Sequence, residues 1–275
     1  MGAVKAAILL LITGALAASS AENVLTPAEK AAGWKLLFDG HSMKGWRDPT
    51  KMTPVGDSWS IEDGCLKANK KPRVREDLLT TDTFTDFELL FEWRISPAGN
   101  SGLKYRAQDS VFLDSTKRLK TAKRFEEQVG YEMEHRLGSR AKLAPDASSE
   151  DYLVAFEYQT IDNEGHPDGR RGGSHSSGAL YDMVAPSQAT AKPIGEFNQS
   201  RIVLKGNHVE HWLNGVKVVD TNLDSPEIRQ ALERRWKGTG VYRLLAEQPK
   251  KNCPIALQNH NDEAWFRNIK IRPLK

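Results

Sequence analysis

The segment that most constrains the fold is residues 201–220, "RIVLKGNHVEHWLNGVKVVD". Two strong turn dipeptides, Gly206-Asn207 and Asn214-Gly215, separate runs of β-branched and aromatic residues. This pattern predicts three successive antiparallel strands joined by tight turns.

Short β-type runs recur from Trp34 to the C-terminus, with Gly, Asp, Asn and Pro between them. In "FELLFEWRI" (87–95), every second residue from Phe87 to Trp93 is apolar, which is the period of a strand with one core face. About eight strands at this spacing, in a chain of 275 residues, predict an all-β jelly-roll sandwich of two antiparallel sheets. A chain of this length can form one large domain.

Two segments interrupt the strands, and one short helix is expected before them. Thr26-Pro27 and Ser225-Pro226 are typical helix starts, so short helices are expected after each of them. Residues 110–151 form a highly charged insertion with helical spacing. It is interpreted as a solvated helix face or a mobile loop, with a lid or a partner-binding surface as alternatives.

The N-terminal sequence "MGAVKAAILLLITGALAASSA" has the features of a cleavable signal peptide, residues 1–21: a lysine, a short apolar run and small residues near its end. The run is too short for a stable membrane insertion, which needs about 20 apolar residues. A secreted or periplasmic protein with one mature domain, 22–275, is therefore expected. In that setting Cys65 and Cys253 could form a disulfide or remain separate thiols.

Charge and motifs exclude several functions. The 39 basic and 36 acidic residues are interspersed, which argues against a nucleic-acid partner. The sequence contains no phosphate-binding loop, no GxGxxG and no GxSxG, so nucleotide and serine-hydrolase chemistry has no support.

Polar residues recur at i, i+2 spacing in four of the expected strands, which predicts a polar sheet face. The pairs are Glu92 with Arg94, Lys104 with Arg106, Glu157 with Gln159, and Gln258 with His260. Sugar hydroxyls need such donors and acceptors, and Glu and His can act as acid or base. The alternative is an ordinary wet sheet face with surface ion pairs.

Potential metal ligands also occur near one another in "FEYQTIDNEGHPDGRRGGSH". They are Glu157, Asp162, His166, Asp168 and His175. Such an oxygen-rich set suits a divalent cation, Ca²⁺, Mg²⁺ or Mn²⁺. The spacing matches no compact metal motif, so a loop without metal is the competing interpretation.

Seven stretches span nearly the whole mature chain: "GWKLLFDGHSMKGW", "WSIEDGCL", "FELLFEWRISPAGNSGLKYR", "FEYQTIDNEGHPD", "SGALYD", "GEFNQSRIVLKGNHVEHWLNGVKVV" and "IALQNHNDEAWFRNIKIRPL". Taken together, they resemble the 3-keto-disaccharide hydrolase family (3-keto-glucoside 1,2-lyase or 3-keto-2-hydroxyglucal hydratase). The resemblance implies a concanavalin-like jelly roll with its ligand on the concave face. It also implies 3-keto-glycoside substrates, supplied by an upstream sugar 3-dehydrogenase and cleaved by elimination and hydration.

The resemblance also suggests roles for individual residues. Glu157 is expected to be a base or metal ligand, and His260 an acid, base or metal ligand. The remaining expected substrate-binding residues are Glu92, Arg94, Asn100, Arg106, Gln159, Tyr181 and Gln258. The chain has Asn259 and Asn261 where the family often has Asp and Gly in "LQDHG". A non-catalytic carbohydrate-binding module on the same fold is the alternative.

Overall fold

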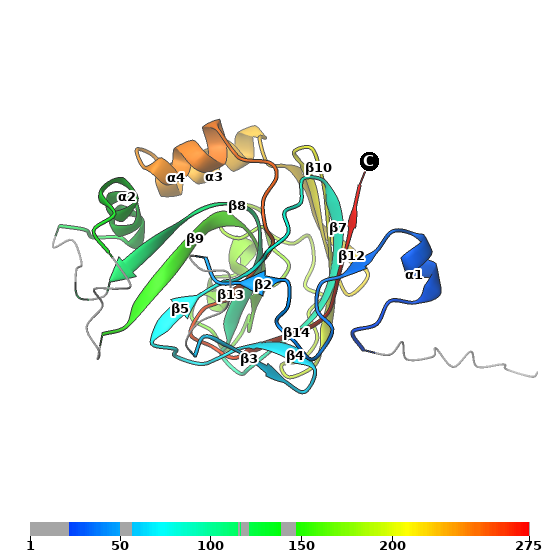
Figure 1. The fold of residues 1–275 in the computed structure, drawn as a ribbon. Helices are drawn as coiled ribbons and strands as arrows, with labels where there is room; N and C mark the ends of the chain where they lie inside the picture. Colours follow the sequence, from blue (N-terminus) through cyan, green and yellow to red (C-terminus); the bar gives the residue numbers. More distant parts are fainter. Residues whose placement is uncertain (1–21, 50–56, 115, 117–120, 139–146, 275) are drawn as a thin grey trace, which may run out of the picture.

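Two β-sheets packed face to face form the body of the molecule (Figure 1). The structure is a computed structural model that describes residues 22–49, 57–114, 116, 121–138 and 147–274. The predicted signal peptide, residues 1–21, lies outside the described residues, so it and the domain boundary at residue 22 stay predictions. Among the described residues, no helix is long and apolar enough to cross a membrane.

The first sheet has eight strands in the order β12-β11-β10-β7-β14-β4-β3, and β1 pairs with β14. Its strands are β1 (Lys35–Leu36), β3 (Trp59–Glu62), β4 (Cys65–Ala68), β7 (Phe87–Ile95), β10 (Asn198–Lys205), β11 (His208–Leu213), β12 (Val216–Asn222) and β14 (Ala264–Pro273). The predicted meander is confirmed, because β10, β11 and β12 pair in sequence through the two predicted turns.

The second sheet has six strands in the order β2-β6-β13-β8-β9-β5. They are β2 (Trp46–Arg47), β5 (Val74–Glu76), β6 (Leu78–Thr80), β8 (Asn100–Asp114), β9 (Ser149–Ile161) and β13 (Ala256–Asn259). All pairs are antiparallel except β5 with β9. The prediction of an all-β jelly-roll sandwich with short helices is therefore confirmed.

The helices lie outside the sheets. They are α1 (Pro27–Ala31), α2 (Phe125–His135), α3 (Pro226–Trp236) and α4 (Gly240–Tyr242), with short turns η2 (Gly169–Arg171), η3 (Gly173–His175) and η4 (Arg243–Glu247). Thr26 and Ser225 cap α1 and α3, as the sequence predicted, because each side-chain oxygen accepts an N–H of the first turn. Figure 1 shows α2, α3 and α4 together on the side of β8 and β9.

The charged segment 110–151 is only partly an insertion. Residues 110–114 continue β8, residues 149–151 begin β9, and α2 lies between the two strands. The two cysteines are both buried and both free. Of the two alternatives, the structure therefore has separate thiols: Cys65 belongs to β4, and Cys253 lies before β13 in the other sheet.

Apolar side chains from both sheets fill the space between them, and a few polar side chains cross it. The hydroxyl of Tyr105 lies 3.0 Å from Nε2 of the buried His211, whose Nδ1 donates to the carbonyl of Gly178. The hydroxyl of Tyr158 lies 2.8 Å from the hydroxyl of Ser200. Each of these contacts links the six-stranded sheet to the eight-stranded sheet, and the buried polar groups that make them have hydrogen-bond partners.

Candidate functional site

A cavity of about 230 Å³ lies on the outer face of the six-stranded sheet, the face turned away from the eight-stranded sheet. Residues of β8, β9 and β13 form its floor, among them Lys104, Glu157 and Gln258. Phe125 of α2 and Arg235 of α3 line the opposite side. The helices that interrupt the strand pattern therefore complete the cavity.

Strand alternation places Glu157 in this cavity. Its neighbours Phe156 and Tyr158 belong to the core, so the glutamate side chain points to the other face of β9. The Gln258 amide donates a 2.9 Å hydrogen bond to the Glu157 carboxylate. Burial raises the pKa of Glu157 to about 7, against the lowering effect of Lys104. A carboxylate with this pKa can gain or lose a proton near neutral pH.

Gly102 makes room for the Glu157 side chain. It lies in β8, directly opposite Gln159 of β9 and Gln258 of β13. A Cβ atom at this position would be 2.8 Å from Oε1 of Glu157. Any larger residue would therefore displace the carboxylate.

Lys104 forms a buried ion pair beneath the cavity. Its Nζ lies 2.7 Å from the carboxylate of Asp77, and each side chain is 5% exposed. Burial works against the charge of Lys104, but the carboxylates of Asp77 and Glu157 outweigh it and raise its pKa. Lys104 is therefore a fixed positive charge close to Glu157.

Two side-chain oxygens at the cavity wall are available as acceptors. In the part of the chain that the structure describes, Oδ1 of Asn100 and Oε1 of Gln258 are buried and have no hydrogen-bond partner. The side-chain oxygen of Gln159 accepts the N–H of Thr160, which leaves its amide N–H groups as donors. Unpaired buried acceptors cost free energy, so a hydroxyl-rich ligand would satisfy them.

His260 follows β13 and also lines the cavity. Burial and the nearby charge of Arg75 lower its pKa to about 3, so the ring is neutral at pH 7. The preceding Asn259 is buried and structural: its amide donates to the carbonyls of Ser58 and Asn69. This explains why a polar residue occupies the core-facing side of the strand.

Tyr181 also lines the cavity, beside a second group of polar residues. Its hydroxyl donates to Asp168 at 2.8 Å, and its ring lies 5.1 Å from that of His175 and 5.4 Å from the Arg235 guanidinium. Asp168 also lies 3.3 Å from His175. These contacts hold the loop after β9 against α3.

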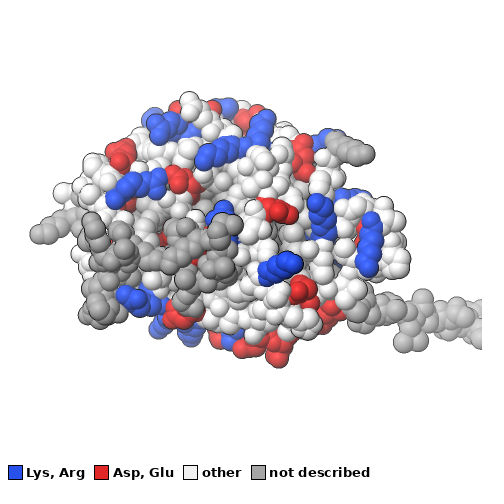
Figure 2. Space-filling view, in the orientation of Figure 1, with Lys and Arg blue, Asp and Glu red and all other residues white. Residues whose placement is uncertain are grey.

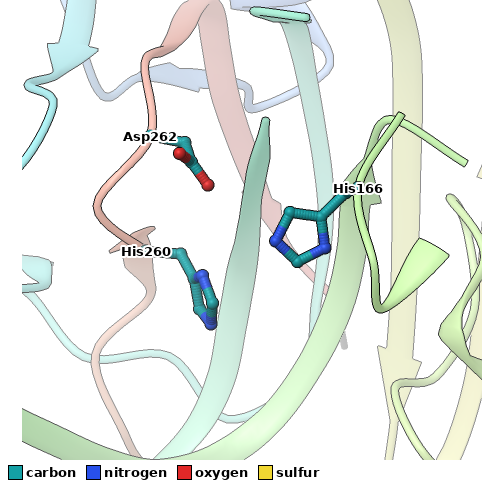
Figure 3. Close-up of side chains that lie close together, drawn as sticks. All are labelled: His166, His260 and Asp262. Carbon is teal, nitrogen blue, oxygen red and sulfur yellow. The ribbon is translucent and has the colours of Figure 1, made fainter. Parts of the chain in front are cut away.

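His166, His260 and Asp262 form another group of polar side chains, next to the cavity (Figure 3). One potential ligand atom from each residue lies within 4.8 Å of the others. His260 and Asp262 come from the turn between β13 and β14, and His166 comes from the loop after β9. Of the five potential ligands predicted from the loop sequence, only His166 belongs to this group.

The predicted positions of Glu92 and Arg94 on the cavity face are wrong. Both lie in β7 of the eight-stranded sheet, on its outer surface. Glu92 accepts a 2.9 Å hydrogen bond from Arg267, and the guanidinium of Arg94 stacks over the rings of Phe197 and Trp265. Alternation correctly grouped the two residues on one face but could not identify the sheet.

Arg106 is also absent from the cavity, against expectation. The β8–β9 register shifts after Tyr105, and Arg106 has a positive φ of 53°. This β-bulge breaks the alternation that begins at Lys104. The Arg106 guanidinium instead donates to the carbonyl of Gly206, at the turn between β10 and β11.

Sequence reasoning missed Arg235, Arg75 and Asp262. Arg235 belongs to a helix with a polar face, which gave no signal of a buried cation. Asp262 and His260 both lie in the turn between β13 and β14, where Asn261 has a positive φ of 71°, so strand alternation could not predict that their side chains converge. On the face shown in Figure 2, basic and acidic side chains are interspersed, as the sequence indicated.

Comparison with known proteins identifies the family of this chain. The family described as 3-keto-alpha-glucoside-1,2-lyase-like domain matches residues 33–272. The chain belongs to this family. A 3-keto-disaccharide hydrolase of Bacteroides thetaiotaomicron is 30% identical over 274 residues, covering 94% of this chain and 84% of that protein. The resemblance inferred from the sequence is therefore confirmed.

Solved structures share the fold of this 3-keto-alpha-glucoside-1,2-lyase-like domain. One, described as a candidate glycosyl hydrolase from Parabacteroides distasonis ATCC 8503, is 25% identical with a TM-score of 0.67. The alignment covers 93% of this chain and all of that one. A second structure from the same organism is 22% identical, with a TM-score of 0.56 and coverage of 88% and 99%. It supports the fold alone.

Proposed function

We propose that this protein cleaves 3-keto-glycosides by proton abstraction at C2, β-elimination at C1 and hydration of the product. The observation that carries the proposal is Glu157, a cavity carboxylate whose pKa burial raises to about 7. A general base is most effective when its pKa lies near the working pH. The family membership and the 3-keto-disaccharide hydrolase relative support the choice of substrate.

The C3 ketone makes the C2 proton acidic. Glu157 takes this proton, and the electron pair of the C–H bond passes into the enolate. Expulsion of the C1 oxygen, which leaves as the free alcohol with the proton that Glu157 took, then forms a C1–C2 double bond conjugated with the ketone. Water adds at C1 and a proton returns to C2, so that one water is consumed and the glycosidic bond is hydrolysed.

Other cavity residues are assigned to binding and charge stabilisation. The ammonium of Lys104 lowers the energy of nearby negative charge, including the enolate. The unpaired oxygens of Asn100 and Gln258 accept hydrogen bonds from sugar hydroxyls, and the amide of Gln159 donates to a sugar oxygen. Tyr181 forms part of the rim. The neutral ring of His260 is suited to coordinate a divalent cation or donate one hydrogen bond, rather than act as a cationic acid.

The experiment is incubation of the purified protein with 4-nitrophenyl 3-keto-β-glucoside and its α anomer. Release of 4-nitrophenol, with a transient enone absorbance and deuterium at C2 in heavy water, is the expected result. Saturable binding of these sugars without turnover, with Mn²⁺, Mg²⁺ or Ca²⁺ supplied, would instead favour a carbohydrate-binding module.

The proposal includes the cellular setting. A sugar 3-dehydrogenase must form the ketone first, because the unoxidised glycoside lacks an acidic C2 proton. The N-terminal sequence supports export to the periplasm or the exterior. Cell fractionation of the full-length protein tests this, and a cytoplasmic product of full length would contradict it.

Gly102→Ala is expected to lower kcat more than 10-fold while leaving the fold intact. The new methyl group would meet the flexible end of Glu157, so the carboxylate moves instead of the backbone. Steady-state kinetics and thermal unfolding check this. Gly206→Ala, at the turn between β10 and β11 and remote from the cavity, is the control: its positive φ of 61° should cost stability, but kcat should be unchanged. An unchanged kcat in Gly102→Ala would show that Glu157 does not need its present position.

A further inference from the structure

We infer that His166, His260 and Asp262 form a binding site for one divalent transition-metal ion at the edge of the cavity. The three side chains converge from two loops that are far apart in sequence (Figure 3). The imidazole planes of His166 and His260 lie at 81°, with 5.9 Å between their centroids. The rings therefore do not stack, and each can direct an edge at a common point.

The distances are compatible with one ion after small side-chain rotations. Potential ligand atoms of the three residues lie within 4.8 Å of one another. Two ligands about 2.1 Å from one tetrahedral ion are roughly 3.4 Å apart. The ligand atoms therefore have to approach one another by at most about 1.4 Å, which rotations of these half-buried side chains can supply.

The kind of ion follows from the ligands. Two imidazoles with one carboxylate leave open coordination positions and suit Mn²⁺, Fe²⁺, Co²⁺ or Zn²⁺. Ca²⁺ and Mg²⁺ prefer shells made of oxygen, so they fit this group less well. Of the divalent cations expected from the sequence, Ca²⁺, Mg²⁺ and Mn²⁺, the ligands therefore favour Mn²⁺.

One neighbouring contact supports the metal site, and another would have to change when an ion binds. The backbone N–H of Asn100 donates to the carboxylate of Asp262, which orients this side chain. Nδ1 of His166 accepts the N–H of Asp168 at 3.1 Å. A neutral imidazole has one lone pair, so coordination through the other nitrogen requires His166 to change tautomer and give up this bond. This change supplies a spectroscopic signature.

A second group of similar composition provides the contrast. His208, Glu210 and Asp220 are also close together. However, the ammonium of Lys217 already lies between Glu210 and Asp220, and His208 contacts Asp220 at 2.7 Å. A lysine therefore neutralises these carboxylates, and an ion would have to displace it.

The inferred site rests on the proposed function for its role. His260 lines the cavity and belongs to the metal group, so an ion held there lies beside the substrate. Such an ion would polarise a keto or enolate oxygen as a Lewis acid. The chemistry that it would supply is stabilisation of negative charge on oxygen.

The test is calorimetric titration of chelator-treated protein with MnCl₂ and CoCl₂, combined with the visible absorbance of Co²⁺. One ion per chain is expected. His166→Ala and Asp262→Asn should each weaken binding more than about 100-fold, since even residues behind the ligands matter by 10- to 100-fold. His208→Ala is the matched control and should bind normally. Nitrogen NMR should show the tautomer change at His166.

The possible outcomes distinguish a failure of the inferred metal site from a failure of the proposed reaction. Metal binding that survives both His166→Ala and Asp262→Asn, or no saturable binding in the parent, overturns the site. Loss of binding in His208→Ala alone also overturns it by moving the ion to the other group. Specific binding at His166 and Asp262 without turnover of a 3-keto-glucoside supports the site and contradicts the proposed function. Full turnover by protein that binds no ion contradicts the metal site and supports the proposed function.

Discussion

Glu157→Gln is expected to lower kcat by about 10²–10⁴-fold, the usual contribution of a general base. The amide keeps the size of the side chain but cannot accept the C2 proton. In the parent protein, kcat/KM should rise with pH and level off above about 7, because only the ionised carboxylate is active. The measurement is a pH–rate profile with a 3-keto-glucoside.

The same substitution should make the protein more stable at alkaline pH. The folded-state pKa of Glu157 is above its ordinary value of 4.5, so the native state holds this proton more tightly than the unfolded state. Stability therefore falls as pH rises from about 4.5 to about 7. A shift of this size corresponds to at most about 3 kcal/mol. In Glu157→Gln this pH-dependent decrease in the free energy of unfolding should be absent. Urea unfolding of both proteins at pH 5 and pH 8 measures the difference.

Glu92→Gln is the matched control for Glu157→Gln. Glu92 is another strand glutamate, but it lies on the outer surface of the other sheet. Its replacement should leave kcat and its pH dependence unchanged. Equal losses of activity in both variants would contradict the assignment of Glu157, as would a parent pH profile that is flat through neutrality.

Lys104→Met is expected to destabilise the protein by about 3–5 kcal/mol. The substitution leaves the carboxylate of Asp77 buried without its cation, which is the costly way to break a buried pair. Asp77 would retain the N–H of Asn259 at 3.2 Å, which is a weak compensation. Urea unfolding at pH 7 gives the magnitude.

Two further measurements distinguish loss of charge from loss of packing in Lys104→Met. In the double variant Asp77→Asn with Lys104→Met, the unpaired charge is gone, so most of the lost stability should return. Lys104 also lowers the pKa of Glu157, so any active Lys104→Met protein should need a higher pH. A double variant no more stable than the single one would show that Lys104 acts through packing.

Local sequence patterns predicted the elements well and their placement less well. The turns at Gly206-Asn207 and Asn214-Gly215 specified the meander, because turn chemistry is local. Alternation placed Glu157 and Gln258 on a shared polar face because both strands are regular there. The same rule failed after Lys104, where the bulge at Arg106 is not marked by a glycine or proline.

Long-range relations account for the remaining differences. Period-2 spacing shows which residues share a face but not which of two sheets carries it, and this misplaced Glu92 and Arg94. The group of His166, His260 and Asp262 depends on how two loops meet. Nothing in the sequence near His166 specifies a partner almost a hundred residues away, although His166 and His260 were each recognised as potential ligands.

Hydrogen bonds between the two sheets determine which positions of this protein can be substituted without shifting a strand. The hydrogen bond between the hydroxyls of Tyr158 and Ser200 lies on the core side of β9 and fixes the register of this strand. A shift of one residue would turn the Glu157 side chain into the core. Because the hydrogen bond does not involve the cavity residues, substitutions on the cavity face leave the register intact. A change at a position such as Gln159 can therefore alter what the cavity binds without losing the strand register that presents the Glu157 carboxylate.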